Sequence, residues 1–337
     1  MRIVLWLFMT LVLVSPLPGE DNPSRRPIPD PTSLASSNSL SLFVVSARPE
    51  KAGLRQLFKT ALNGTDSQGG PASMGSLMSD VISRQNQQNL IMAALPLQWV
   101  RVDQPDSQGR LRTLTVLSVS GWQGMQALFY QGMLAGKVLE TRRHRGEVIV
   151  LRPGWQNPED LMVMARSQGS FVNCATPELA RQTIDRLLDR PSPPGHGPLW
   201  DAYAGLCKTR DIYGAAVNRN GSLLRLISWA GRSITARIRR EVGAQNFDRI
   251  VATVRVATLE AEVISDDQID LELRFSTATP SQIDDLKMVW LTAQHELKSL
   301  DRLSQFRATP LPSGLLVNLS ITGFRGDVSR FLGTLSL

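Results

Sequence analysis

The chain of 337 residues has only two cysteines and three histidines. Zinc sites and thiol redox sites need clustered cysteine and histidine ligands, so this scarcity leaves few places to build them. The sequence contains no Cys-x-x-Cys pair, and His295 lacks the second histidine of the His-Glu-x-x-His zinc-protease motif. We therefore expect no metal ion and no other cofactor.

Motifs for nucleophilic catalysis and phosphate binding are also lacking. The segment nearest to the Gly-x-Ser-x-Gly turn of hydrolases, residues 121–124, carries no serine. None of the six lysines stands at Ser-x-x-Lys spacing, and Walker and dinucleotide-binding loops are missing. His144 is expected at a hairpin tip and His196 in an exposed linker. These absences favour a non-enzymatic protein; a hydrolase assembled from residues far apart in sequence is the alternative.

Only one long hydrophobic run is present, and it lies at the N-terminus. Arg2 is followed by largely apolar residues over 3–14, before Pro16 and Pro18 break the run. About a dozen apolar residues match the core of a signal peptide and are too few to span a bilayer of about 30 Å comfortably. We expect residues 1–19 to export the protein to the periplasm or the extracellular space; an uncleaved N-terminal anchor is the alternative.

The chain is basic, with a net charge of +7 and a pI near 9.9. Nearly all of the positive charge is arginine, scattered along the chain, and this preference over lysine is typical of a GC-rich bacterial genome. The signatures of zinc-finger and RNA-recognition modules are absent. The composition therefore fits an anionic membrane surface or an envelope polymer as partner, and we expect no nucleic acid.

Composition divides the chain into two bodies. With 42% hydrophobic residues, a chain of this length suits two domains better than one. Residues 20–39 are rich in proline and serine and predict an extended tether. Residues 191–197 hold three prolines and two glycines, which neither a helix nor a central strand tolerates. We expect an N-terminal domain over 40–190, a linker over 191–197 and a C-terminal domain over 198–337.

A weak repeat recurs in both bodies. A strand ends, a capping residue follows, and proline takes the first helical position, as at Pro49, Pro177 and Pro280. The sequence predicts an amphipathic helix after each proline, with apolar stripes within 54–62, 179–188 and 283–297. A further strand–helix unit is predicted over 114–133.

Hairpins are predicted where two strands flank a turn, at Arg145-Gly146 and at Gln168-Gly169. In the second body we expect an antiparallel sheet with strands at 250–256, 260–264, 269–275 and 315–321. Strand–helix–strand–strand order with hairpins indicates an α+β fold class: two domains of mainly antiparallel sheet with helices packed on one face.

The run from Ser170 to Leu188 reads as a strand, the sequence Ala-Thr-Pro-Glu-Leu and a helix. It resembles segments of uncharacterised exported bacterial proteins built from repeated sheet-and-helix units. The resemblance covers a small part of the chain. It implies an extracytoplasmic α+β protein and assigns no site residue.

One segment, residues 222–242, carries the sharpest functional pattern. Its apolar residues share one face of a predicted helix, while Arg225, Arg232 and Arg239 follow at seven-residue spacing on the other, with Arg240 adding to the charge. A basic amphipathic helix of this kind can bind an anionic membrane surface or an acidic polymer. The alternative is a surface helix whose apolar face lies in the core.

Cys174 and Cys207 allow two interpretations. In an oxidising compartment they could form a disulfide across the predicted linker, which would stabilise the fold by about 3–4 kcal/mol. Otherwise they are two separate thiols that pack as small hydrophobic side chains.

Our leading functional interpretation is an exported, non-enzymatic protein that works by binding or as an envelope component. One alternative is the extracytoplasmic hydrolase, for which His295 with a carboxylate and a hydroxyl would have to meet in a pocket. The other is an anionic-surface binder that uses the helix over 222–242.

Overall fold

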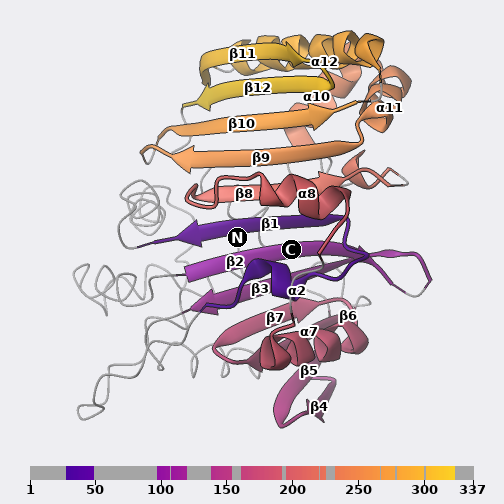
Figure 1. The fold of residues 1–337 in the computed structure, drawn as a ribbon, viewed down its shortest axis with the longest axis vertical. Coiled ribbons are helices and arrows are strands. Elements are labelled where there is room, and N and C mark those ends of the chain that lie inside the picture. The colour runs from indigo at the N-terminus through magenta and orange to yellow at the C-terminus, as the bar shows by residue number, and fades with distance from the viewer. Residues whose placement is uncertain are drawn as a thin grey trace, which may run out of the picture.

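The computed structural model describes residues 28–48, 97–106, 108–119, 138–153, 161–191, 195–219, 221–224, 232–265, 267–277, 279–299 and 301–322. Its strands are β1 Ser41–Ala47, β2 Leu97–Pro105, β3 Leu111–Val119, β4 Glu140–His144, β5 Glu147–Pro153, β6 Leu161–Ser167, β7 Ser170–Cys174, β8 Ile212–Val217, β9 Val256–Val263, β10 Ile269–Ser276, β11 Leu303–Leu311 and β12 Gly314–Ile321. These 12 strands form one open antiparallel sheet in the order β11-β12-β10-β9-β8-β1-β2-β3-β7-β6-β5-β4 (Figure 1). The protein is therefore of the α+β class, as the sequence predicts, with its strands in a single sheet.

Helices lie on both sides of this sheet. They are α2 Pro31–Leu34, α7 Pro177–Asp189, α8 Pro198–Ala204, α10 Arg232–Val242, α11 Ala244–Thr253 and α12 Pro280–Ser299. Figure 1 shows α2, α7 and α8 on the viewer's side of the sheet and α10 behind it. Among the described helices, none combines the length and the apolarity needed to cross a membrane.

Strand alternation explains how the helices come to occupy opposite faces. Successive side chains of a strand point to opposite faces, and directly paired residues on neighbouring strands share a face. Leu42 and Val44 of β1 belong to a hydrophobic cluster that includes residues of α2, α7 and α8. Phe43 packs against a second cluster, which includes residues of α10, α11 and α12. We call the two sides of the sheet the Leu42 face and the Phe43 face.

Both clusters involve residues of the paired strands β1 and β8, one cluster on each face of the sheet. We call this strand pair the junction. The pairing is antiparallel, with Phe43 opposite Gly214 and Val45 opposite Ile212. All six residues of β8 are buried, because both of its faces are covered. A Cβ atom on Gly214 would overlap the Phe43 ring and lie 2.7 Å from the carbonyl oxygen of Leu42. Glycine is therefore the residue that lets Phe43 lie across β8.

Cap and turn chemistry predicted from the sequence is confirmed. Thr176 caps α7 by accepting a hydrogen bond from the Leu179 amide, with Pro177 in the first turn. Both predicted hairpins are present, β4–β5 and β6–β7, and both turns have two consecutive residues with positive φ. Such φ values define the type I′ turn, whose twist matches that of the flanking strands. The helices predicted at 54–62 and within 114–133 fall outside the described residues.

Two predictions about local structure are wrong. Residues 250–256 were expected to form a strand, but most of them belong to α11, whose Phe247, Ile250 and Val251 are buried at helical spacing. The described part of the expected tether, residues 28–39, is packed on the fold: Asp30 caps α2, and Leu34 is fully buried against the Leu42 face. An aspartate before a proline is a helix start, and Leu34 supplies the apolar anchor.

The expected linker over 191–197 lies between α7 and α8, but the hydrophobic clusters do not divide there. Trp200 and Tyr203 of α8, with Tyr213 of β8, belong to the same cluster as β1 and α7. The change from one cluster to the other takes place at the junction, within the sheet.

Candidate functional site

A small hollow lies on the Phe43 face at the junction. Its volume is about 210 Å³, and it is lined by Leu40, Ser41, Arg101, Asp103, Leu111, Thr113, Ala216 and Ser222. These residues come from the start of β1, from β2, from the start of β3, and from the end of β8 with the turn after it. Both strands of the junction therefore contribute to the hollow.

An ion pair forms the polar wall of the hollow. Arg101 and Asp103 are two positions apart on β2, so they share a face. Arg101 Nε lies 3.2 Å from Asp103 Oδ2, and Arg101 Nη2 lies 3.1 Å from Asp103 Oδ1. Arg101 is only 8% exposed and Asp103 only 4%. The two-point contact fixes the plane of the guanidinium.

Two hydroxyl groups complete the surroundings of the carboxylate. Ser41 lies opposite Asp103 on β1, and its Oγ donates to Asp103 Oδ2 at 2.7 Å. Thr113 lies opposite Asp103 on β3, and its Oγ1 donates to Asp103 Oδ1 at 2.6 Å. Each carboxylate oxygen thus accepts from one hydroxyl and from the guanidinium. These bonds within the protein hold the carboxylate and the guanidinium in one arrangement.

Sequence reasoning did not single out Arg101 or Asp103. A signal for them exists, since opposite charges at Arg101 and Asp103 alternate with Val100 and Val102 in the middle of the strand. Val100 and Val102 are fully buried on the Leu42 face. Alternation of this kind indicates a polar feature on one face of a central strand.

The predicted basic helix is present in part. Residues 222–224 are helical and α10 begins at Arg232, whereas Arg225 lies outside the described residues. Arg239 forms an ion pair with Asp248 of α11, and Arg240 is exposed. Ile238, on the opposite side of α10, is buried in the second hydrophobic cluster. The apolar face of α10 therefore packs in the core.

Both cysteines are free thiols. Cys174 is buried in β7, where its Sγ donates to the carbonyl oxygen of Thr176 and burial raises its pKa to about 12. Cys207 is exposed, and a hydrogen bond with the Thr209 hydroxyl lowers its pKa. The two thiols are therefore separate, and Cys174 is buried as the second interpretation expects, whereas Cys207 is not.

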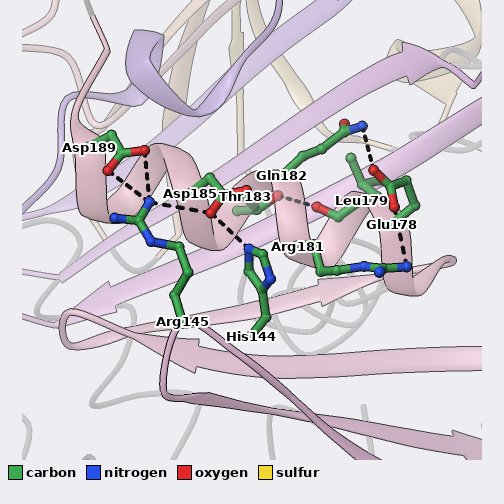
Figure 2. A network of polar contacts seen from close by, with 9 residues as sticks. All are labelled: His144, Arg145, Glu178, Leu179, Arg181, Gln182, Thr183, Asp185 and Asp189. Atoms are coloured by element: carbon green, nitrogen blue, oxygen red, sulfur yellow. Dashed lines mark hydrogen bonds and ion pairs between the residues drawn. The ribbon is translucent and has the colours of Figure 1, made fainter.

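His144 lies at the predicted hairpin tip and joins a polar network with α7 (Figure 2). Its Nε2 is 2.8 Å from Asp185 Oδ1, and Arg145 contacts both Asp185 and Asp189. Burial alone would raise the pKa of Asp185, but the hydrogen bonds from His144 and Arg145 outweigh it and hold that pKa below its ordinary value of 3.8. The network fastens the β4–β5 hairpin to α7 and lies away from the hollow.

His196 and His295 also lie outside the hollow. His196 is exposed ahead of α8, as expected, and His295 is exposed on α12. The hydrolase interpretation requires His295 to meet a carboxylate and a hydroxyl in a pocket, and His295 is not among the residues that line this one.

A second polar feature runs across the Leu42 face. Cross-strand partners align a row of five side chains, Ser46, Gln98, Ser118, Ser170 and Ser167. All five are buried, and Ser118 Oγ lies 2.7 Å from Ser170 Oγ. In the part of the chain that the structure describes, Gln98 Oε1 and Ser167 Oγ have no hydrogen-bond partner. Buried polar atoms without partners lower stability.

The described residues contain no group of three or more histidine, cysteine, aspartate or glutamate side chains arranged to hold a metal ion. Comparison with known proteins adds no assignment: no family model, no curated protein and no solved structure matches the chain. The hollow and its chemistry are therefore the basis for assigning a function.

Proposed function

We propose that the protein is an exported, non-enzymatic binding protein that takes a small ligand into the hollow at the junction. Export is supported by residues 1–19, whose length and apolarity suit a signal peptide. Binding is supported by the position of the hollow, since ligand sites are favoured where two structural units meet.

The observation that carries this proposal is the buried ion pair of Arg101 and Asp103 in the wall of the hollow. Burying two charges costs several kcal/mol per ion, and replacement by apolar residues of similar volume is often neutral or stabilising by about 1–4 kcal/mol. A buried pair is therefore weak support for stability. Beside a hollow, the fixed hydrogen-bond donors and acceptors of such a pair can recognise the polar groups of a ligand.

The size of the hollow limits the ligand. Pockets for drug-sized molecules occupy about 300–1,000 Å³, and this hollow has about 210 Å³. Leu40 and Leu111 supply apolar surface beside the ion pair. The hollow thus suits a small molecule with a short apolar part and a polar group.

Filling the hollow tests the proposal. Ala216 lines it, and Ala257 is its cross-strand partner on the same face but does not line it. Ala216→Val should abolish the amide chemical-shift changes that small polar compounds cause at Ser41 and Thr113, whereas Ala257→Val should preserve them. Equal responses in both variants, or no response in the wild type, would contradict the proposal.

A second candidate function uses α10. Arg237 and Arg239 have acidic partners, Glu296 and Asp248, yet their side chains are 51% and 46% exposed, and Arg240 is exposed beside them. This row of exposed cations favours an anionic membrane surface or envelope polymer as partner. Replacing Arg225, Arg232, Arg239 and Arg240 by glutamine should weaken binding to vesicles that contain anionic lipid, and weak, unchanged binding in both forms would eliminate this candidate.

A further inference from the structure

The helix α12 is apolar on its outward side as well as on its buried side. It lies at the β11 end of the molecule (Figure 1) and packs on β11, β12, α10 and α11. Its buried side is one apolar row: Ile283, Leu286, Val289, Ala293 and Leu297. On the opposite side, Met288 is 43% exposed and Leu291 48%. The other exposed large hydrophobic residues in the described part of the chain lie in or beside strands.

Met288 and Leu291 are the centre of a longer exposed row. We call it the α12 stripe, and its members are Asp284, Met288, Leu291, His295 and Lys298. The intervals between them alternate between four and three residues. This alternation keeps side chains in line along a helix, and it is the spacing with which two helices pack in a coiled coil. The stripe therefore has the pattern of a helix contact that no described part of the chain makes.

The two ends of the α12 stripe carry opposite charges. Asp284 lies near the start of the helix and Lys298 in its last turn. The neighbouring acidic residues Asp285 and Glu296 form ion pairs with arginines of α11 and α10, whereas among the described residues neither Asp284 nor Lys298 has an ion-pair partner. An antiparallel copy of the stripe would bring each charge to its opposite, and a parallel copy would bring like charges together.

We propose that the α12 stripe binds the same stripe of a second copy of this chain, with the two helices antiparallel. In one register, Met288 lies opposite Leu291 of the second copy. The same register places Asp284 opposite His295, with Lys298 about one turn further along. Apolar side chains then meet in the middle, and a carboxylate meets an imidazole and an ammonium group at each end. The contact is self-complementary, as the two-fold interface of a homodimer requires.

The length of α12 limits the strength of this dimer. A helix of 20 residues is about 30 Å long, and one helix from each copy buries less than the about 1,200–2,000 Å² of stable interfaces. The dimer is therefore weak and reversible. No residue that lines the hollow belongs to α12, so this inference is independent of the proposed ligand site.

Sedimentation equilibrium of the full-length chain tests the proposal, at concentrations up to about 1 mM because a contact of this size is weak. Leu291→Gln should raise the dissociation constant at least about tenfold, since the two-fold symmetry removes the apolar contact twice. Leu139→Gln is the control: Leu139 is 53% exposed beside β4, far from the stripe in the sheet order, and its variant should dimerise as the wild type does. Both variants should keep the melting temperature of the wild-type monomer.

Charge reversal tests the antiparallel arrangement. Asp284→Lys alone, or Lys298→Asp alone, should raise the dissociation constant about threefold to tenfold, because each places like charges together at both ends of the contact. The double variant restores opposite charges and should return the constant to within about twofold of the wild-type value. These differences should shrink in high salt.

Each outcome decides the proposal. A dimer that Leu291→Gln weakens and that the double reversal restores supports it. A monomer at every concentration, or a dimer that Leu291→Gln leaves unchanged, overturns it. A dimer that Leu291→Gln weakens but the double reversal does not restore overturns the antiparallel arrangement. A monomer that binds phosphatidylcholine vesicles through Leu291 also overturns it, because lipid would then cover the stripe.

Discussion

The two ends of the sheet are built alike but covered on opposite faces. Beyond β1, the strands β2, β3, β7, β6, β5 and β4 bury the Leu42 face under α2, α7 and α8. Beyond β8, the strands β9, β10, β12 and β11 bury the Phe43 face under α10, α11 and α12. In each end, the first strand along the chain (β1 or β8) is followed by a hairpin (β2–β3 or β9–β10). The last strand along the chain in that end, β7 or β12, pairs with the second strand of the hairpin, β3 or β10. One continuous sheet thus carries two sets of helices, packed on opposite faces of its two ends.

The covered face changes from one side of the sheet to the other at the junction, and this change explains the pattern of apolar residues in the strands. β8 reads as a nearly continuous apolar run because both of its faces are covered. β9 and β10 alternate, with Ala261 and Phe275 buried on the Phe43 face while Glu260 and Arg274 lie on the other. The buried ion pair of Arg101 and Asp103 in β2 departs from this pattern, and it is the basis of the proposed binding site.

The largest effect is expected at the hollow beside the junction. Asp103→Leu removes the two-point carboxylate contact of the buried Arg101 guanidinium, which should lower the free energy of unfolding by about 3–5 kcal/mol. Adding Arg101→Met should recover most of that loss, because an apolar pair replaces the ion pair. Denaturant unfolding of both variants measures this, and additive losses in the double variant would show that the two residues do not act as a pair.

Matched substitutions in the two ends of the sheet test whether the ends unfold together. Ile184 of α7 and Ile250 of α11 are both fully buried, one in each hydrophobic cluster. Ile184→Ala and Ile250→Ala should each cost about 3 kcal/mol. If the junction couples the ends, both variants shift a single unfolding transition in calorimetry. Two transitions, each moved by only one variant, would show separately folding ends.

Gly214→Ala tests the close packing of β1 against β8 at the junction. The added Cβ would overlap the Phe43 ring, so the variant should lose about 2 kcal/mol, the range of overpacking. Gly205→Ala is the control, because a Cβ there makes only an ordinary contact, 3.6 Å from the Ala202 carbonyl oxygen. Equal midpoints for the two variants in a thermal melt would mean that Phe43 does not lie across Gly214.

In the polar row on the Leu42 face, one substitution should stabilise the protein, unlike the substitutions above. Ser167 is fully buried, and its hydroxyl has no hydrogen-bond partner among the described residues. Ser167→Ala should therefore raise the free energy of unfolding by up to about 1 kcal/mol. Ser118→Ala removes the hydrogen-bond partner of the Ser170 hydroxyl and should lower the free energy of unfolding by a similar amount. A loss in both variants would mean that Ser167 is satisfied.

The smallest effect concerns the network in Figure 2. Asp185→Asn should destabilise the protein at neutral pH by less than about 1 kcal/mol, because the pair is partly exposed. The pKa of Asp185 is lower in the folded protein than in the unfolded chain, so its contribution is present at neutral pH and is lost as pH falls through the folded-state pKa, below 3.8. Wild type and variant should converge in strong acid, and a constant difference down to that pH would contradict this origin.

Local features were predictable from the sequence, and long-range features were not. The cap at Thr176 and both hairpin turns follow from neighbouring residues, and they appear as predicted. The strand expected at 250–256 failed because Val and Ile favour strands in general, whereas here their spacing places them on the buried side of α11. Tertiary packing overrode propensity.

The hollow and the junction could not be derived from neighbours in sequence. Ser41, Asp103 and Thr113 meet only because β1, β2 and β3 pair in one register. The antiparallel pairing of β1 with β8 joins residues far apart in the chain, and a linker rich in proline suggested a boundary elsewhere. Most of the described strands and helices were therefore predictable from the sequence, whereas the pairing of β1 with β8 was not.

The continuous sheet is tested most directly by a nuclear Overhauser measurement between backbone protons of Phe43 and Gly214 in the full-length chain. Cross-strand contacts are expected there and between Val45 and Ile212, as in the other antiparallel pairs of the sheet. If contacts such as those of β1 with β2 were present while every β1–β8 contact was missing, the continuous sheet and its junction hollow would be contradicted.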